Sequence, residues 1–190
     1  GAEEKQKFQD VQGGLSWPTS KAPAYFCILG QKYVTPDFLG NPTPPGKRVL
    51  LAEFEGNTLE MNHFFDKLLD KTIQMACDYV YCELPQDKSL GGFESDFIEY
   101  SRSRSNNGCS LINAYDADNF LLGISRIKNS LNLNELKICQ DSVVASQIKG
   151  ITQEDLAENP EDTLHAINGL RHVLSSFYRN PPVIRFKKHS

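Results

Sequence analysis

The chain has 190 residues, of which 39% are hydrophobic and 23% are charged, and its formal net charge is −4. This length is enough for one domain with a substantial core and too short for two comfortable domains. No apolar run approaches the roughly 20 residues that a membrane-spanning helix needs, and the polar start of the chain does not resemble a secretory signal. We therefore expect one globular domain over residues 1–190, with no membrane association, that is part of a longer protein.

The cysteines and histidines predict no disulfide framework and no zinc site. The five cysteines form no CxxC pair and lie mostly in apolar stretches, which is typical of buried free thiols in a reducing cytoplasm. No histidine pairs with a cysteine at ligand spacing. The residues concerned are Cys27, Cys77, Cys82, Cys109 and Cys139, with His63, His165, His172 and His189.

The first third of the chain is predicted to form three strands. Residues 7–12 read as a short strand that runs into two glycines, and residues 24–34 are rich in aromatic and β-branched side chains. Residues 35–47 carry four prolines and two glycines and are expected to form a loop. Residues 48–54 then form the third strand. Strands so close in sequence favour an antiparallel meander.

Helices and strands alternate after the meander. Apolar residues from 61 to 76 keep the spacing of one buried helical stripe, and Asn57 is placed to cap that helix. Residues 79–84 are nearly all apolar, as in a strand buried on both faces. A helix over 93–104 and a strand over 110–115 follow.

Three further segments complete the predicted order. Asp116 or Asp118 is expected to cap a helix, which precedes an extended piece at 136–139 and a helix near 142–149. The last helix is expected to begin with Asn159 as its cap and Pro160 in its first turn, and to end at Pro181-Pro182.

The order of these elements predicts a fold class. Three strands are followed by helix, strand, helix, strand and helix, which indicates a mixed α/β sheet of five strands with helices on both faces. This is the strand order of the ribonuclease H-like fold.

Three acidic residues stand at the edges of predicted elements: Asp10, Glu83 and Asp162. Each alone has an ordinary explanation, respectively a turn, an exposed strand end and a helix N-terminus that favours negative charge. They converge if their strands are neighbours and the last helix packs over the strand ends. Because Mg²⁺ and Mn²⁺ prefer oxygen ligands, we predict that these three residues are catalytic and hold two such ions. Glu53 and Asp116 also stand at strand ends and are expected to be structural.

Four stretches of the chain resemble the C-terminal nuclease domain of a tailed-phage terminase large subunit, the DNA-packaging motor. The stretches are residues 10–12 ahead of the second strand, 48–56 with 78–86, 124–131, and 161–170. The resemblance implies a ribonuclease H-like endonuclease, dependent on Mg²⁺ or Mn²⁺, that cuts double-stranded phage DNA during genome packaging. It covers essentially the whole chain.

The same resemblance implies roles for single residues. Asp10 would be the acid shared by the two ions, on the central strand. Glu161 and Asp162 match the family's closing acids, and His165 stands where a further Asp is common, so the choice between Glu161 and Asp162 as metal ligand stays open.

The family's ATPase motor is expected to be absent. Residues 40–48 have five residues between their glycines and an arginine where a phosphate-binding loop needs Ser or Thr. The implied partners are double-stranded DNA and, in the full system, the protein's own ATPase domain, a portal and a small terminase subunit. The implied location is the cytoplasm of a bacterial host, for a phage or prophage protein.

The end of the chain is basic. Residues 163–190 contain five Lys or Arg and no Asp or Glu, so they form either a phosphate-contacting face or a solvated basic tail.

Two other functions fit the same residues. One is a different ribonuclease H-like nuclease, such as a junction resolvase or an RNA–DNA hybrid nuclease. The other is a catalytically degenerate module that docks packaging proteins, in which the three acids are surface charge.

Overall fold

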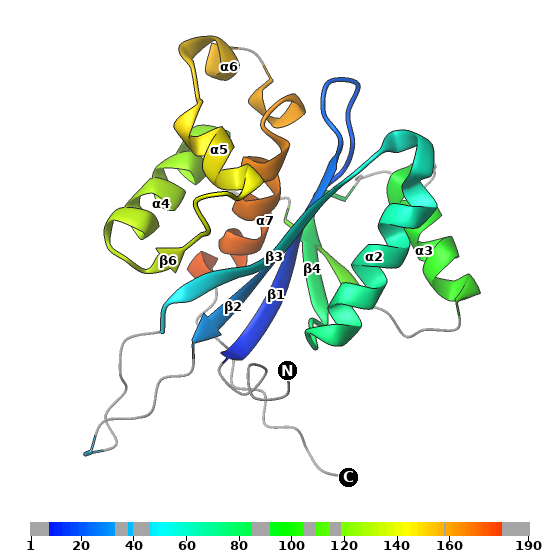
Figure 1. The fold of residues 1–190 in the computed structure, drawn as a ribbon, viewed down its shortest axis with the longest axis horizontal. Coiled ribbons are helices and arrows are strands. Elements are labelled where there is room, and N and C mark those ends of the chain that lie inside the picture. The colour runs from blue at the N-terminus through cyan, green and yellow to red at the C-terminus, as the bar shows by residue number, and fades with distance from the viewer. Residues whose placement is uncertain are drawn as a thin grey trace.

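Six strands form one mixed sheet in the order β5-β4-β1-β2-β3-β6 (Figure 1). The computed structural model describes residues 8–32, 38–39, 46–84, 92–104, 109–114, 119–157 and 159–179. The first three strands form the predicted antiparallel meander, and each later strand pairs in parallel with its neighbour. The strands are β1 (Phe8–Ser16), β2 (Ala24–Lys32), β3 (Arg48–Gly56), β4 (Tyr79–Cys82), β5 (Ser110–Asn113) and β6 (Leu136–Lys137).

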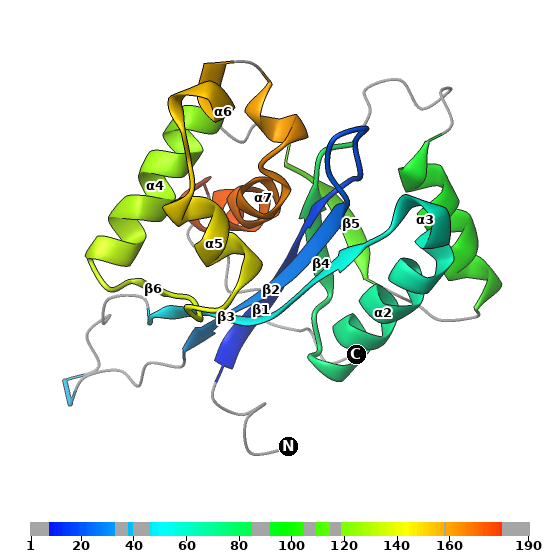
Figure 2. The ribbon, with the colours of Figure 1, turned by 45° about the horizontal axis from the view of Figure 1, so that its top comes forward.

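Helices cover both faces of the sheet, as predicted (Figure 2). On one face lie α4 (Phe120–Asn132), α5 (Val143–Lys149) and α7 (His165–Arg179), and on the other lie α2 (Met61–Gln74) and α3 (Phe93–Ser103). The short α6 (Gln153–Ala157) and two 3-10 turns, η1 (Thr58–Glu60) and η2 (Pro160–Asp162), complete the order. Among the described residues, no helix has the length and apolar character needed to cross a bilayer.

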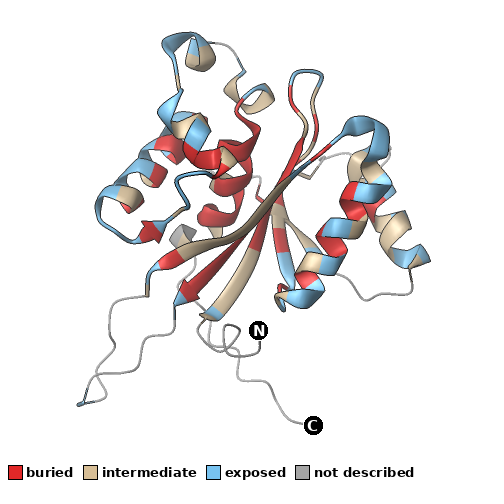
Figure 3. Ribbon diagram, viewed as in Figure 1, coloured by how far each residue is buried: buried red, intermediate tan, exposed pale blue. Residues whose placement is uncertain are grey.

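The central strand β2 shows why the sheet needs two helical layers. Residues 24–31 of this strand are all buried (Figure 3). Tyr25, Cys27 and Leu29 belong to the core under α7, whereas Phe26 and Ile28 belong to the core under α2. The alternation of side chains across a strand therefore divides one apolar run between two cores.

Several elements begin or end where the sequence did not predict. Asn57 caps the 3-10 turn η1 and not α2 itself, and the strand count and three further boundaries also differ from the prediction. The sheet has a sixth strand, β6, which is only two residues long and was expected as an extended piece outside the sheet. Asn119 caps α4 by accepting a hydrogen bond from the Leu122 N–H, whereas Asp116 and Asp118 lie outside the described residues. The turn that begins at Pro160 is a 3-10 turn, and α7 begins later, at His165.

The third boundary, the end of β1, matters most for function. β1 does not stop at its two glycines but continues to Ser16. A Cβ atom on Gly14 would lie 2.1 Å from the carbonyl oxygen of Gly169, so this strand position is where α7 approaches the sheet most closely. Glycine here serves helix packing rather than a turn. The predicted ends of the last helix, Pro181-Pro182, lie outside the described residues.

Candidate functional site

Glu83 lies at the carboxyl end of β4, beside the end of β1. Its side chain is exposed, and its backbone carbonyl accepts a hydrogen bond from the indole N–H of Trp17 at 2.9 Å. In the parallel pairing of β1 with β4, Gly14 is opposite Tyr81. Continuing this register by two residues places Glu83 beside Ser16.

Asp162 lies at the same end of the sheet, in η2 just before α7. Its backbone carbonyl accepts a hydrogen bond of 2.8 Å from the hydroxyl of Thr19, which lies in the turn that joins β1 to β2. The structure therefore places two of the three predicted acids near the carboxyl end of β1. Glu161, the alternative ligand, is in the same 3-10 turn and is half-buried.

Asp10 lies at the opposite end of β1, so the predicted meeting of the three acids is wrong. Gly13 is opposite Val80, which places Asp10 beside Cys77, six residues along the strand direction from Glu83. At roughly 3.3 Å per residue this separation is about 20 Å. Among the described residues, no three His, Cys, Asp or Glu side chains form a group able to hold a metal ion.

The packing of α7 on β1 confirms this placement independently. Near the start of the helix, Asn168 donates a hydrogen bond to Ser16. Near its end, Ser176 donates a hydrogen bond to Gln12 at 2.5 Å. Eight helical residues and four strand residues both span roughly 12–13 Å, so the helix and the strand run side by side in opposite directions. Asp10 is therefore at the C-terminal end of α7, away from the start of the helix.

Burial raises the pKa of Asp10 above its ordinary value of 3.8. The two amide hydrogen bonds from Gln12, each 3.3 Å long, oppose this effect only in part. A carboxylate at the C-terminal end of a helix also faces the negative end of its dipole. Both features raise the free energy of the ionised form of Asp10 in the metal-free protein.

A neutral pair, Ser16 and Asn168, stands where the end of β1 meets the start of α7. The amide nitrogen of Asn168 donates to the Ser16 hydroxyl at 3.1 Å, and both side chains are buried, at 2% and 5% exposed. The Asn168 carbonyl oxygen accepts a hydrogen bond from the guanidinium of Arg171 at 2.7 Å. These two hydrogen bonds orient the Asn168 amide so that its nitrogen faces β1 and its oxygen faces Arg171.

The sequence prediction missed this pair, although two signals pointed to it. Asn168, Arg171 and His172 interrupt the apolar face of the last helix at helical spacing, which is unusual for a buried stripe. Ser16 is the polar end of the first strand only if the predicted strand continues past Gly13 and Gly14.

His165 lies near this pair and joins three elements. Its Nε2 is 3.1 Å from a carboxylate oxygen of Glu55 on β3, and its Nδ1 is 3.0 Å from the amide nitrogen of Gln147 on α5. The carbonyl oxygen of Gln147 accepts hydrogen bonds from the N–H groups of Ala166 and Ile167, the first free donors of α7. Since the amide nitrogen is a donor, Nδ1 is the acceptor and Nε2 donates to Glu55. His165 is therefore a structural connector with both ring nitrogens engaged.

Glu53 is structural, as expected. Its carboxylate accepts hydrogen bonds from the Tyr25 hydroxyl at 2.8 Å and from the Val143 N–H at 2.6 Å, so it supports the start of α5 beside the N-cap Ser142. Asp116 lies outside the described residues.

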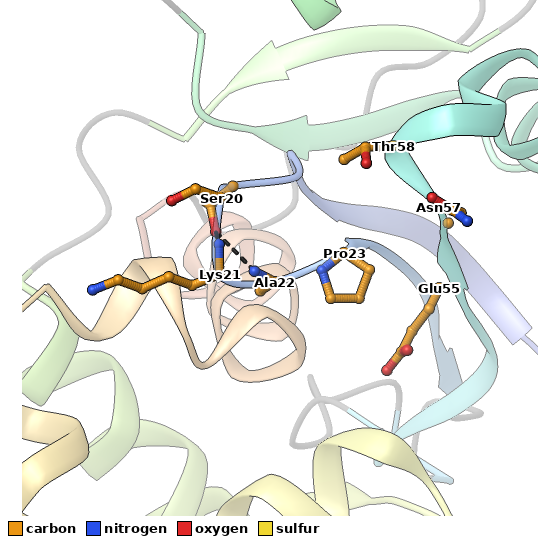
Figure 4. Close-up of a pocket in the computed structure, with 9 residues that line it drawn as sticks. Ser20, Lys21, Ala22, Pro23, Glu55, Asn57 and Thr58 are labelled. Atoms are coloured by element: carbon orange, nitrogen blue, oxygen red, sulfur yellow. Dashed lines mark hydrogen bonds between the residues drawn. The ribbon is translucent and has the colours of Figure 1, made fainter.

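An open polar cavity of about 450 Å³ lies at the same end of the sheet, between the β1–β2 turn and the end of β3 (Figure 4). Residues 19–23 and 55–58 line it, with Lys21 and Glu55 as its charged side chains. Figure 4 shows Lys21 on one side and Glu55 on the other. The Glu55 carboxylate in this cavity lies at the same end of the molecule, but it already accepts a hydrogen bond from His165.

Within the described residues, the basic end of the chain forms no phosphate-binding face. Arg171 points inward, to Asn168 and to the ring of Phe120, whose centroid is 5.3 Å from the guanidinium carbon. The side chains of the other four basic residues, at positions 179, 185, 187 and 188, lie outside what the structure describes.

Comparisons with known proteins show what fold this arrangement belongs to. No protein-family model matches the sequence, and no curated protein matches it. The large terminase nuclease from thermophilic phage G20c, with bound zinc, is similar with a TM-score of 0.52 and 11% identity, over 87% of this chain and 80% of that chain. The large-terminase (g2p) nuclease domain of bacteriophage SPP1, with bound manganese, is similar with a TM-score of 0.51 and 13% identity, over 93% and 92%.

The predicted ribonuclease H-like fold is confirmed by this likeness. The yeast mitochondrial Holliday junction resolvase Ydc2 matches less well, with a TM-score of 0.43 and 9% identity over 92% of this chain and 82% of that chain. Identities this low establish the architecture and leave the reaction to be argued from the side chains.

Proposed function

We propose that this domain serves phage DNA packaging as a terminase-type module that docks other packaging components and does not itself cut DNA. The observation that carries the proposal is the neutral Ser16–Asn168 pair, which occupies the junction of β1, β4 and α7 beside Glu83. The likeness to two large-terminase nucleases supports the setting, and the neutral side chains at the junction support a role without catalysis.

Among the described residues, the carboxylates do not converge as two divalent ions require. Two-metal hydrolysis needs several carboxylates that converge on ions roughly 3.5–4 Å apart. Within the part of the chain that the structure describes, Glu83 is the one acid beside Ser16 on the neighbouring strand, because Asp10 is displaced by about 20 Å along β1. Asp162 approaches the β1–β2 turn through its backbone carbonyl. We therefore assign no catalytic step to these residues.

A plasmid-cutting assay tests the proposal. The 190-residue chain is incubated with supercoiled DNA and Mn²⁺ or Mg²⁺, beside a Glu83→Ala variant. We expect no conversion to nicked or linear DNA above a chelator control in either case. Metal-dependent cutting by the unmodified chain that is lost in Glu83→Ala would refute the docking assignment.

A second candidate is the metal-dependent nuclease that the sequence predicted. The observation that favours it is that Glu83 is exposed and lies at the same end of the sheet as Asp162. In this case Glu83 and Asp162 are among the ligands of Mg²⁺ or Mn²⁺. Mn²⁺-dependent cutting that disappears in both Glu83→Ala and Asp162→Ala, and persists in Asp10→Ala, would establish it.

The implied partners follow from the same setting. A docking module would bind its own ATPase domain, a portal or a small terminase subunit. Co-purification of the chain with each of these proteins, with and without DNA, distinguishes protein docking from DNA binding.

A further inference from the structure

We infer that Ser16 and Asn168 are the residues that keep divalent cations out of this site, and that their hydrogen bond joins α7 to β1 without an ion. This inference rests on the proposed function and extends it to the residues responsible. It predicts that two substitutions create a cation site.

The first argument is the charge and orientation of the pair. Neither side chain carries charge, and the Asn168 carbonyl oxygen is committed to Arg171 at 2.7 Å. The amide therefore presents its NH₂ group to Ser16. A hydrogen-bond donor offers no lone pair to Mg²⁺ or Mn²⁺, so the helix side of the junction lacks a ligand.

The second argument is burial. Ser16 is 2% exposed and Asn168 is 5% exposed, so the pair presents almost no polar surface to solvent. Two buried polar groups that satisfy each other are stable, whereas two buried carboxylates in their place would repel each other unless a cation lay between them.

The third argument is that α7 is attached to β1 at both ends by neutral bonds. The Ser16–Asn168 bond holds the start of the helix, and the Gln12–Ser176 bond holds the end. Between these bonds Gly14 lets the helix backbone approach the strand.

The geometry also predicts how the site changes when the pair becomes acidic. Ser16→Asp places a carboxylate on the strand beside Glu83, and Asn168→Asp is nearly isosteric and replaces the donor with an acceptor. The double variant then brings three acids to the junction of β1, β4 and α7, which is the donor chemistry that Mn²⁺ takes.

Calorimetric titration with MnCl₂ tests the inference on four chains: the unmodified protein, Asn168→Asp, the double variant Ser16→Asp/Asn168→Asp, and the double variant with Glu83→Gln. We expect no saturable binding by the unmodified protein, saturable binding by the double variant, and loss of that binding with Glu83→Gln. A folded double variant that binds no Mn²⁺, or unmodified protein that binds Mn²⁺ through Glu83, would overturn the inference.

Thermal unfolding covers the case in which the double variant does not fold. The nearly isosteric Asn168→Asp variant is then compared with the unmodified protein, with and without MnCl₂. We expect Mn²⁺ to raise the Tm of the variant and to leave that of the unmodified protein unchanged, and equal responses would contradict the inference. Failure of the proposed function is a separate result, because it is seen as DNA cutting by the unmodified chain.

Discussion

The carboxylate of Glu53 on β3 accepts a hydrogen bond from the backbone N–H of Val143, the first residue of α5, at 2.6 Å. The same carboxylate accepts a hydrogen bond of 2.8 Å from the hydroxyl of Tyr25 on β2, so one acidic side chain joins β2 and β3 to the N-terminus of a helix. An acid at a strand end can therefore be fully explained by structure. The contrast with the exposed Glu83 separates a structural acid from a candidate functional one.

Glu53→Ala is expected to destabilise the domain by about 3 kcal/mol. The substitution removes two hydrogen bonds to a charged group and leaves a buried tyrosine hydroxyl and a helix N–H without their acceptor. Urea unfolding followed by circular dichroism measures the change. The matched control, Glu99→Ala, removes an exposed acid of α3 and should change the free energy of unfolding by less than about 0.5 kcal/mol. Equal effects of the two substitutions would show that Glu53 does not support the start of α5.

Asp10→Asn is expected to leave the fold intact and to remove a pH-dependent loss of stability. Burial raises the pKa of Asp10 in the folded chain above 3.8, so the folded state holds this proton more tightly than the unfolded state. The unmodified protein therefore loses stability, relative to Asp10→Asn, as the pH rises from 3.8 through the raised folded-state pKa.

Urea unfolding at a series of pH values measures this difference for Asp10. An Asp78→Asn variant, which changes an exposed acid near the same strand end, is the control. If Asp10→Asn were instead less stable at neutral pH, the ionised carboxylate would be a stabilising group, and its assignment would have to be revised.

Acid destabilisation is expected from His172. Its ring is 2% exposed, and Nδ1 donates to the carbonyl oxygen of Leu15 at 2.8 Å. Burial, helped by the nearby Arg171, lowers the pKa of His172 from 6.5 to about 4. Since the unfolded chain takes up the proton first, stability is full above pH 6.5 and falls as the pH drops from 6.5 towards 4, by about 3 kcal/mol.

A His172→Gln variant should flatten this part of the stability profile, whatever its stability at neutral pH. His63→Gln changes an exposed histidine and should leave the profile unchanged. A stability profile between pH 4 and 6.5 that is the same for His172→Gln and the unmodified chain would rule out His172 as the titrating group.

Gly14→Ala is expected to destabilise the domain by about 3 kcal/mol or more. The added methyl group would lie 2.1 Å from the carbonyl oxygen of Gly169 and 3.0 Å from Val173, and a helix backbone cannot move aside as a flexible side chain can. Gly92→Ala is the matched control, because a Cβ at that position would have no atom within 4 Å. Thermal unfolding of both variants measures the difference, and similar Tm values would mean that α7 does not approach β1 so closely.

Local sequence patterns by themselves determined most of the architecture. The meander, the helix after Asn57, the strand before Glu83 and the amphipathic last helix were all predicted, because alternation and helical spacing record which face of an element is apolar. The strand before Glu83 is not buried on both faces as predicted, since Tyr79 is exposed. The role of Glu53 as structural was predicted as well. These features depend on neighbours in sequence, so a single chain is enough to identify them.

The site was decided by the tertiary structure. Gly13 and Gly14 look like the end of a strand in sequence, yet they continue β1 because α7 needs the space that a side chain would take. This extension places Ser16 at the end of β1 beside Glu83, about 20 Å from Asp10. Which side chains meet depends on strand register and on the path of a helix packed across the sheet, and both are set by contacts between residues more than 60 positions apart in the chain.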